Sequence, residues 1–427
     1  MGQAQAEAPS ASKTKRAPGF TIDACRSCGS KKLSSFLDLG TTPLADRLLT
    51  DAQLNEPELV APLEIVLCED CSLVQVTETV SPEELFCQNY PYFSSVSKAL
   101  MKHFGDSAAQ ILEERKLGPD SLVVEAASND GYLLKHFVAA GVPVLGIDPA
   151  DGPAKKAQDS GVRTLNTFFT KELAEKLHEE GHRADVFLAN NVLAHVADLN
   201  GFTAGMARLL KDDGVAVIEC PYLLDLIDHC EFDTMYHQHL CYFSITALVN
   251  LFERHGLSLN RVVRTTIHGG SLRLFVGKEK KVEDSVTSLL EKEKALGVDS
   301  LPYYESFAAR VEKLKSDLVS VLERLKAEGK RIAGYGAAAK GCTLLAYCGV
   351  DSKYLDYIVD LNPVKQGQYF TGNHLKIEPP AKLLEDRPDA VLIIAWNFAN
   401  EIMKQQQAYK DGGGIFVIPV PEVSVVE

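Results

Sequence analysis

The chain has 427 residues, more than one ordinary hydrophobic core holds, and this length predicts two or three domains. Its net charge of −14 argues against nucleic acid or an anionic membrane as the main partner, and no apolar run approaches the ~18 residues of a membrane span. Its ten cysteines come without an export signal, so we expect a cytoplasmic protein with reduced thiols. Residues 1–20 lack an apolar segment and are expected to form a disordered tail.

Two close cysteine pairs, Cys25-x2-Cys28 and Cys68-x2-Cys71, mark residues 21–100 as a zinc-binding N-terminal domain. In each pair a tight turn directs both sulfurs at one ion, and two such turns complete a tetrahedral site. Because thiolates fill all four positions, the predicted zinc is structural and has no open position for water. A redox-active pair and two unrelated buried pairs are the alternatives.

Residues 121–220 alternate β-rich runs with helical stretches, as in a parallel sheet that helices cover on both faces, and we place the domain that contains them at residues 101–280. The runs that we expect to form buried strands are residues 122–127, 143–148, 184–190 and 214–220. This alternation predicts a Rossmann-like α/β core.

Polar and acidic residues follow the ends of these strands, where open α/β sheets bind ligands. The first strand ends in a turn-rich loop without the GxGxxG pattern, which argues against a dinucleotide. Glu125 and Asn129 suit an amino-acid-like group, and Asp148 suits a ribose diol, so S-adenosylmethionine and a class I methyltransferase core are favoured over NAD. The predicted cofactor-binding residues are Glu125, Ser128, Asn129, Asp130, Gly131, Asp148, Asn190 and Asn191.

A polar segment around residue 236 places a phenol, two imidazoles and an amide at four consecutive positions. Carbon methylation requires a base, because the nucleophile is an enolate made by removing a proton beside a carbonyl, and histidine is best matched to that task near neutral pH. For the histidines, the alternatives are a metal-binding pair and ordinary surface residues. For Tyr90 and Tyr92, which lie upstream, the alternative is aromatic packing. The candidate catalytic residues are Tyr236, His237, Gln238 and His239, together with His195, Tyr90 and Tyr92.

Residues 281–329 are predicted to form linker helices that pack on a neighbouring domain. Apolar residues recur there at four- and three-residue steps, which gives one helix stripe, and Gly329 is placed to end the helix. The stripe comprises Phe307, Val311, Leu314, Leu318, Val321 and Leu325. A coiled-coil dimer seam is the alternative, although the stripe is short for one.

A second α/β pattern predicts a Rossmann-like C-terminal domain over residues 330–427 that contributes to substrate binding. Its expected strands are residues 331–335, 354–360, 390–395 and 414–418. The small residues after the first strand let a backbone approach a phosphate, and tight packing of helix on strand is the alternative. We expect Tyr335 and Lys340 in this segment, and His268 and Arg273 in the HGGSLR segment, to bind substrate; a simple hairpin is the alternative for HGGSLR.

Several longer stretches occur here in one order, among them CRSCGS, NYPYFSSVS, VEAASNDGYLL, EFDTMYHQHLCYFS, HGGSLR and YGAAAKGCTLLAYCGV. Together they closely resemble the sugar-nucleotide C-methyltransferases, the TDP-4-keto-deoxyhexose 3-C-methyltransferase family of deoxysugar biosynthesis, from about Cys25 to Glu422. The resemblance implies deprotonation at C-3 beside the C-4 ketone, followed by attack on the sulfonium methyl. It assigns the catalytic tyrosine and histidines to Tyr236, His239 and His195, and the N-terminal tyrosine to Tyr90 or Tyr92.

One residue departs from the family pattern, which reads Tyr-His-Glu-His where this chain has Gln238. Gln can be neither a base nor an anion, and it cannot raise the pKa of a neighbouring imidazole by charge pairing. Three interpretations follow: methylation of a nucleotide-linked 4-keto sugar, methylation of another activated carbonyl metabolite, or a zinc-stabilised binding protein that keeps the fold without the chemistry. We expect a monomer or a weak homo-oligomer.

Overall fold

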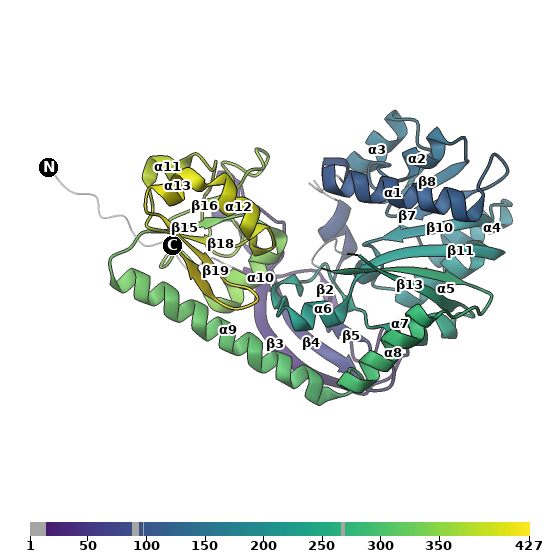
Figure 1. Ribbon diagram of the computed structural model, residues 1–427, viewed down its shortest axis with the longest axis horizontal. Coiled ribbons are helices and arrows are strands. Elements are labelled where there is room, and N and C mark those ends of the chain that lie inside the picture. Colours follow the sequence, from purple (N-terminus) through teal and green to yellow (C-terminus); the bar gives the residue numbers. More distant parts are fainter. Residues whose placement is uncertain (1–13, 88–93, 97, 266–269) are drawn as a thin grey trace.

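The computed structural model describes residues 14–87, 94–96, 98–265 and 270–427. Its strands form three larger sheets and one two-stranded ribbon. Two lobes stand apart at the top of the view in Figure 1, one built on the second sheet and one on the C-terminal sheet, and the N-terminal strands lie between them at the base. The long helix α9 (Leu301–Ala327) runs beneath and ties the lobes together.

The N-terminal sheet is built around β4, whose Leu63, Ile65 and Leu67 alternate along the strand and are fully buried. Strand β12 comes from the middle of the chain and pairs with β5, so this sheet is completed by a distant segment. The strands are β1 (Thr14–Arg16), β3 (Leu33–Pro43), β4 (Glu58–Cys68), β5 (Val74–Val76) and β12 (Cys241–Tyr242); β2 (Gly19–Thr21) and β6 (Glu78–Val80) form the ribbon. The short helices are η1 (Asp51–Asn55), η2 (Glu83–Cys87) and η3 (Ser94–Val96).

The second sheet has seven strands in the order β13-β14-β11-β10-β7-β8-β9. Its pairs are parallel except those that β14 makes with β11 and β13. The sheet therefore has the class I methyltransferase fold that the alternating pattern predicts. Its strands are β7 (Val123–Ala126), β8 (Val144–Asp148), β9 (Thr164–Asn166), β10 (Ala184–Asn190), β11 (Leu210–Pro221), β13 (Ser258–Thr265) and β14 (Ser271–Gly277).

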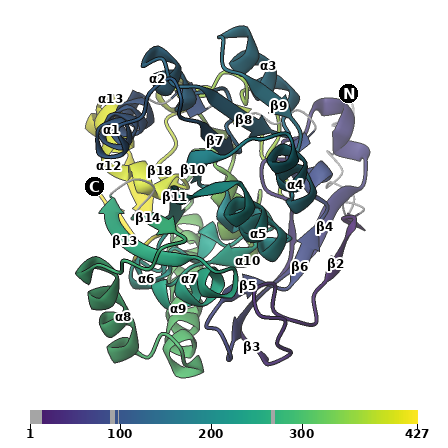
Figure 2. The same cartoon turned by 90° about the vertical axis from the view of Figure 1, so that its right-hand side faces the viewer.

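Helices cover both faces of this sheet because its central strands are apolar on both sides. One face packs on α1 (Lys98–Arg115), α2 (Leu134–Ala139) and α3 (Asp151–Asp159), and the other on α4 (Lys171–Glu179), α5 (Leu199–Leu209) and α7 (Ile245–Arg254). Figure 2 shows α5 on the side of the N-terminal strands and α1 and α2 on the far side. The remaining elements of this region are η4 (Leu193–His195), α6 (Leu223–Asp228) and η5 (Phe232–Thr234).

Two helices, α8 (Asp284–Leu296) and α9, form the predicted linker. The stripe of α9 is buried against β3 and α10 as expected, with one correction: Leu322 is buried at that level of the stripe, whereas Val321 is only partly buried. From α8, the fully buried Glu293 accepts hydrogen bonds from Tyr222, from the backbone N–H of Ile245 and from Thr246. This carboxylate caps the N-terminus of α7 and joins the linker to the methyltransferase sheet.

The C-terminal sheet has the order β17-β16-β15-β18-β19-β20, with β20 antiparallel to β19. It is the second Rossmann-like sheet that the sequence predicts. The strand expected over residues 354–360 is shorter, because Tyr354 and Leu355 form a turn on the carbonyl of Asp351. The elements are β15 (Ile332–Tyr335), α10 (Ala339–Cys348), β16 (Ile358–Val359), β17 (Ile377–Glu378), α11 (Lys382–Asp386), β18 (Ala390–Ile393), η7 (Trp396–Phe398), α12 (Ala399–Gln405), α13 (Gln407–Asp411), β19 (Ile415–Ile418) and β20 (Ser424–Val426).

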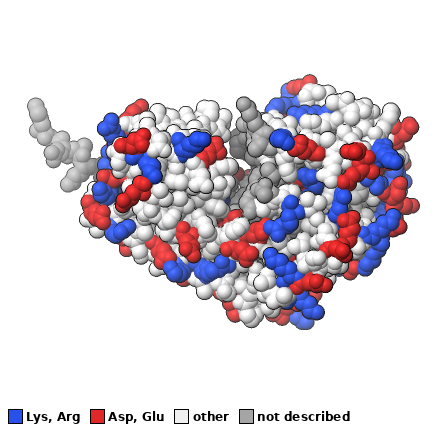
Figure 3. Space-filling model, in the orientation of Figure 1, with Lys and Arg blue, Asp and Glu red and all other residues white. Residues whose placement is uncertain are grey.

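The surface carries acidic and basic side chains side by side. On the face shown in Figure 3 neither sign forms a large continuous area. Among the described residues, no helix combines the length and the apolar character that crossing a membrane requires.

Candidate active site and zinc site

The four cysteines of the two knuckles come together in the N-terminal module. All four sulfur atoms lie within 4.8 Å of one another, with 3.6 Å between Cys25 and Cys71 and 3.5 Å between Cys28 and Cys68. A tetrahedral ion with Zn–S bonds of about 2.3 Å requires S···S separations of about 3.8 Å. The donor set and its spacing therefore fit one zinc ion held by four thiolates.

The two knuckles have the same backbone geometry. The residue after each pair, Gly29 or Ser72, has a left-handed conformation, with φ of 72° and 61°. Its N–H donates to the carbonyl of the first cysteine of the pair, at 2.9 Å for Cys25 and 2.8 Å for Cys68. Each turn thus directs two sulfurs to one side.

Helices of the methyltransferase region hold the knuckles from outside. Asn200 on α5 donates to the carbonyls of Arg26 and Ser27, at 2.9 and 3.0 Å. Asn250 on α7 donates to the carbonyl of Cys71 at 3.3 Å. The zinc module is therefore docked on the second sheet through the knuckle backbone itself.

Asp148 at the carboxyl end of β8 organises the predicted cofactor loop. Its two carboxylate oxygens accept the backbone N–H groups of Asn129 and Ala150, at 2.8 and 2.9 Å. The first bond fixes the loop after β7, where Asn129 and Gly131 have left-handed backbones, with φ of 48° and 74°. A carboxylate held in this way keeps lone pairs available for hydroxyl donors.

The described residues just before α1 close over this loop. The N–H of Ser94 donates to the side chain of Asn129 at 2.9 Å, and Asp130 accepts from Ser95 and from Lys156. Within the described part of the chain, Oγ of Ser128 and Oδ1 of Asp130 are buried without a hydrogen-bond partner. Both atoms belong to the loop that the sequence assigns to the cofactor.

Glu125 lies beneath the loop and is fully buried. Burial raises the pKa of its carboxyl well above the ordinary value, and Tyr132 and Asn190 oppose that rise. Asn190 and Asn191 end the neighbouring strand β10, where the N–H of Asn191 donates to the carbonyl of Glu219 at 2.8 Å. The structure therefore gathers the predicted cofactor-binding residues along one edge of the sheet.

Three of the predicted catalytic side chains meet a few residues beyond this edge. The ring centroids of His239 and Tyr236 lie 4.3 Å apart, and those of His239 and His195 lie 4.8 Å apart. Nε2 of His239 is 3.2 Å from the Tyr236 hydroxyl. Residues separated by about forty positions in the chain are thus combined into one cluster of a phenol and two imidazoles.

Backbone carbonyls fix both imidazoles in the same tautomer. Nδ1 of His239 donates to the carbonyl of Thr234 at 2.8 Å, and Nδ1 of His195 donates to the carbonyl of Gln238 at 2.6 Å. In the neutral ring the proton is then on Nδ1, and Nε2 has the lone pair. Burial lowers the pKa of His195, which keeps that ring neutral near pH 7.

The other two residues of the segment make different contacts. His237 is buried, and its Nε2 lies 3.0 Å from the carbonyl of Pro62 on β4, so it joins the loop to the N-terminal sheet. Gln238 is buried as well, and its backbone carbonyl, rather than its side chain, holds His195.

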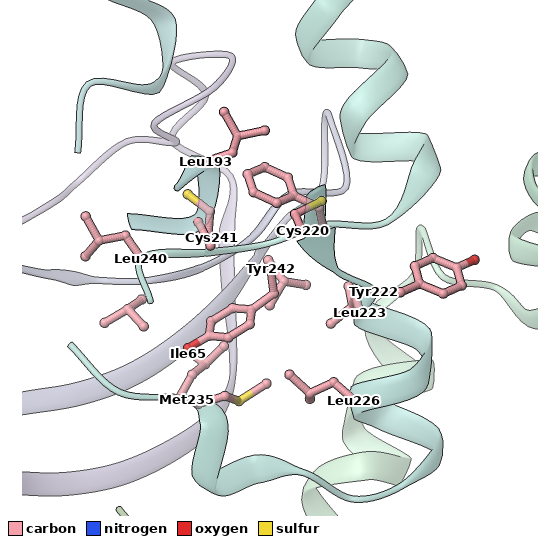
Figure 4. Packing of buried hydrophobic residues seen from close by; sticks show 14 of the residues in the cluster. Ile65, Leu193, Cys220, Tyr222, Leu223, Leu226, Met235, Leu240, Cys241 and Tyr242 are labelled. Atoms are coloured by element: carbon pink, nitrogen blue, oxygen red, sulfur yellow. The ribbon is translucent and has the colours of Figure 1, made fainter. Parts of the chain in front are cut away.

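An apolar underside supports the cluster. Figure 4 shows Ile65 from β4 and Met235 from the loop beside the Tyr242 ring, and Leu240 and Leu193 belong to the same buried cluster. The N–H of Leu240 also donates to the carbonyl of Ala194 at 2.7 Å, which locks the loop to η4.

Arg273 is buried next to this edge in an arrangement that the sequence did not predict. Its Nε donates to Glu219 at 2.6 Å, and the same carboxylate lies 2.9 Å from Nε2 of His103 on α1. An acidic residue at the end of the buried strand β11 was the available signal for Glu219, whereas His103 gave none. His268, Tyr90 and Tyr92 lie outside the described residues.

The glycine-rich loop of the C-terminal domain is closely filled by protein. A Cβ on Gly336 would lie 2.5 Å from the Cβ of Ala395, and one on Gly341 would lie 2.4 Å from Ile394. The N–H of Ala337 donates to the carboxylate of Asp360 at 2.7 Å. Close packing therefore explains these small residues, and Tyr335 lies in the hydrophobic core beneath them.

The Lys340 side chain lies against an aromatic ring. Its ammonium lies 3.5 Å from the ring centroid of Trp396, and burial lowers its pKa while Asp233 and Glu231 oppose that change. Trp396 in turn donates from Nε1 to Asp233 at 2.7 Å. Neither Trp396 nor Asp233 was predicted to be functional, although Asp233 lies in the EFDTMYHQHLCYFS stretch.

Comparison with known proteins supplies the family. Three family models match successive parts of the chain: "Putative zinc binding domain" over residues 25–86, "Methyltransferase domain" over 99–262 and "C-methyltransferase C-terminal domain" over 266–421. The C-methyltransferase NovU of Streptomyces niveus is 34% identical over 408 residues, which is 95% of this chain and 97% of NovU. The chain belongs to the C-methyltransferase family.

More distant similarities cover parts of the chain. The ubiquinone biosynthesis O-methyltransferase of Azorhizobium caulinodans is 28% identical over 127 residues, 29% of this chain and 47% of that protein. The magnesium protoporphyrin IX methyltransferase of Synechocystis PCC 6803, solved with bound SAH, is 18% identical, with a TM-score of 0.35 over 43% of this chain and 89% of that one.

The protein is thus an S-adenosylmethionine-dependent C-methyltransferase with a structural zinc site. Family membership establishes the methyltransferase activity. The cluster of four cysteines, together with the matching zinc-binding family model, establishes the zinc site.

Proposed function

We propose that this C-methyltransferase removes a proton from a carbon beside a ketone and methylates that carbon, and that its substrate is a TDP-linked 4-keto-deoxysugar methylated at C-3. The observation that carries the proposal is the cluster of Tyr236, His239 and His195, in which both imidazoles are fixed with a lone pair on Nε2. Such a cluster is suited to remove a proton from carbon and to hold it.

The proposed work of each residue follows from these contacts. Nε2 of His239 takes the proton from the substrate carbon, and the Thr234 carbonyl stabilises the resulting imidazolium through Nδ1. The hydroxyl of Tyr236, next to Nε2, donates to the enolate oxygen, and His195 completes the polar wall. S-adenosylmethionine, when bound, supplies the electrophilic methyl group.

The cofactor is assigned to the edge formed by β7, β8 and β10. Asp148 receives the ribose hydroxyls, while Asn129, Ser128 and Asp130 line the position of the polar end of the molecule. Glu125 stands beneath this loop, and Gly131, Asn190 and Asn191 shape its sides. We keep Lys340, Tyr335, His268 and Arg273 as proposed substrate-binding residues.

The resemblance to sugar-nucleotide C-methyltransferases supports the sugar, and kinship with a protein named C-methyltransferase NovU supports carbon as the acceptor. The test incubates the protein with S-adenosylmethionine and a panel of TDP-4-keto-deoxysugars, and then looks for a gain of one methylene in mass. We expect methylation of at least one member. Methylation of other activated carbonyl compounds alone would replace the sugar by another acceptor.

A second measurement tests the proton abstraction directly. In D2O without cofactor, the wild-type protein should exchange the C-3 proton of its sugar substrate for deuterium, because His239 can act before any methyl transfer. A product methylated on oxygen, or no exchange with a sugar that is methylated, would contradict the proposed chemistry.

A further inference from the structure

The C-terminal domain reaches the proton-transfer cluster through a short chain of contacts. Thr343 on α10 donates its hydroxyl to the carbonyl of Met235 at 3.0 Å. Trp396 on η7 donates to Oδ2 of Asp233 at 2.7 Å. Both donors lie on helices of the C-terminal domain, and both acceptors lie in the segment that precedes Tyr236.

These two acceptors flank one residue, Thr234. Its carbonyl accepts the Nδ1 proton of His239 and thereby determines which ring nitrogen of that imidazole has the lone pair. The turn has little freedom of its own, because the Thr234 hydroxyl donates to the carbonyl of Glu231 at 2.8 Å. Whatever fixes Asp233 and Met235 therefore fixes the direction of the Thr234 carbonyl.

The Thr343 contact is buried, and the Trp396 contact ends on a buried carboxyl group. Asp233 has no exposed surface, and within the described residues its Oδ1 has no hydrogen-bond partner. Loss of the Trp396 donor would leave a second buried carboxylate oxygen without one, with the Lys340 ammonium as the remaining compensating charge. The carboxylate thus has a strong preference for one position.

We propose that the C-terminal domain positions the catalytic base: through Trp396 and Thr343 it holds the Thr234 carbonyl that keeps His239 in the tautomer with its lone pair on Nε2. This inference rests on the proposed role of His239. It makes Trp396, Thr343 and Asp233 positioning residues, and it assigns Lys340 to this contact between domains in addition to any contact with substrate.

The experiment compares the wild-type protein with a Trp396→Phe, Thr343→Val double variant, which removes both donors, keeps the shape of Thr343 and leaves an aromatic ring at position 396. Nitrogen-15 NMR of histidine-labelled protein, with His239→Asn used to assign the signal, reads the tautomer without any substrate. We expect Nδ1 to be protonated in the wild type and a mixture of the two tautomers in the double variant. With a sugar that the wild type methylates, kcat should fall about 10- to 100-fold, as for a misplaced catalytic group, while KM changes little.

Two controls make the result specific. Thr371→Val removes a comparable hydroxyl contact between the C-terminal domain and the N-terminal sheet, to Glu58 at 2.9 Å, and should leave tautomer and kcat unchanged. Thr343→Ser keeps the hydroxyl and, combined with wild-type Trp396, should retain the wild-type spectrum.

An unchanged His239 spectrum in a folded double variant, or a changed spectrum with an unchanged kcat, would overturn the inference. If the double variant does not fold, Thr343→Val alone is compared with Thr343→Ser by the same spectrum. Failure of every sugar as a substrate would count against the proposed function only, because the spectrum is recorded without substrate.

Discussion

At the scale of single residues, the backbone carbonyls that hold His195 and His239 determine the chemistry of those rings. Each carbonyl takes the Nδ1 proton, and a ring held in this way is a base at Nε2. The carbonyl that holds His195 belongs to residue 238, so Gln at that position preserves this contact although the family has Glu there. The missing carboxylate removes a charge from the site but not the orientation of His195.

Replacement of His239 by Asn should abolish turnover and leave the fold intact. Loss of a general base costs about 10²- to 10⁴-fold in rate. Binding of S-adenosylmethionine, measured by calorimetry, should stay within about twofold of the wild type, since His239 is placed outside the proposed cofactor loop. Turnover at the wild-type rate would remove His239 from the mechanism, and Tyr236 would become the candidate base.

At neutral pH, the buried carboxyl group of Glu125 should lower the free energy of unfolding of the protein. Its pKa is raised in the folded state, so the native protein holds a proton that the unfolded chain releases, and the free energy of unfolding falls as pH rises above the ordinary carboxyl value. Near pH 7.5 the Glu125→Gln variant should therefore unfold at a higher temperature than the wild type. Its free energy of unfolding should exceed that of the wild type by more than the about 0.5 kcal/mol typical of surface changes. Near pH 4 the difference should disappear. Equal melting temperatures of the two proteins at both pH values would show that the wild-type carboxyl group does not destabilise the folded protein.

At the scale of elements, the edge of the second sheet could be read from the sequence because its strands are continuous apolar runs followed by polar loops. The strands β7, β8, β10 and β11 lie where the pattern places them. Strand β12 has two residues and no periodic signal, so its pairing with β5 could not be predicted. The direction of Lys340 could not be predicted either, because it depends on Asp233 and Trp396, more than a hundred residues apart.

The loop between β7 and α2 depends on Asp148, and this dependence gives a test. Asp148→Asn can satisfy the N–H groups of Asn129 and Ala150 only in part, and it loses the negative charge. A lost charge-assisted hydrogen bond is worth about 1.5–3 kcal/mol, so the affinity for S-adenosylmethionine should fall about 10- to 100-fold. Asp159→Asn, an exposed change on α3, is the matched control and should bind as the wild type does. Equal affinity of the two variants would move the ribose away from Asp148.

At the scale of the whole molecule, the segment that carries Tyr236 and His239 contacts three parts of the structure. Its beginning is held by α10 and η7 of the C-terminal domain, and its middle rests on Pro62 through His237. Its end continues into β12, which pairs with β5 next to the second cysteine knuckle. The sequence pattern divides the chain into separate domains and does not indicate that one segment contacts all of them.

Loss of zinc should therefore reach the catalytic cluster. In Cys68→Ser we expect bound zinc to fall well below one equivalent by metal analysis, the melting temperature to drop, and turnover to be lost before S-adenosylmethionine binding is. The order follows from the structure, since β12 lies on the zinc module while β7 and β8 do not. Cys348→Ala, a buried cysteine outside the cluster, should keep its zinc. Full turnover in a zinc-free variant would show that β12 is held without the metal.

The shared loop also bears on recombination between relatives. A chimera that exchanges the C-terminal domain to obtain a new sugar preference would bring in a foreign α10 and η7, and with them new partners for Asp233 and Met235. Crossover points placed in α9 would look safe by sequence, yet they would separate the two halves of one hydrogen-bonded unit. Exchanges that carry residues 231–242 together with the incoming domain keep that unit whole, and libraries built on this rule should contain a larger fraction of active enzymes.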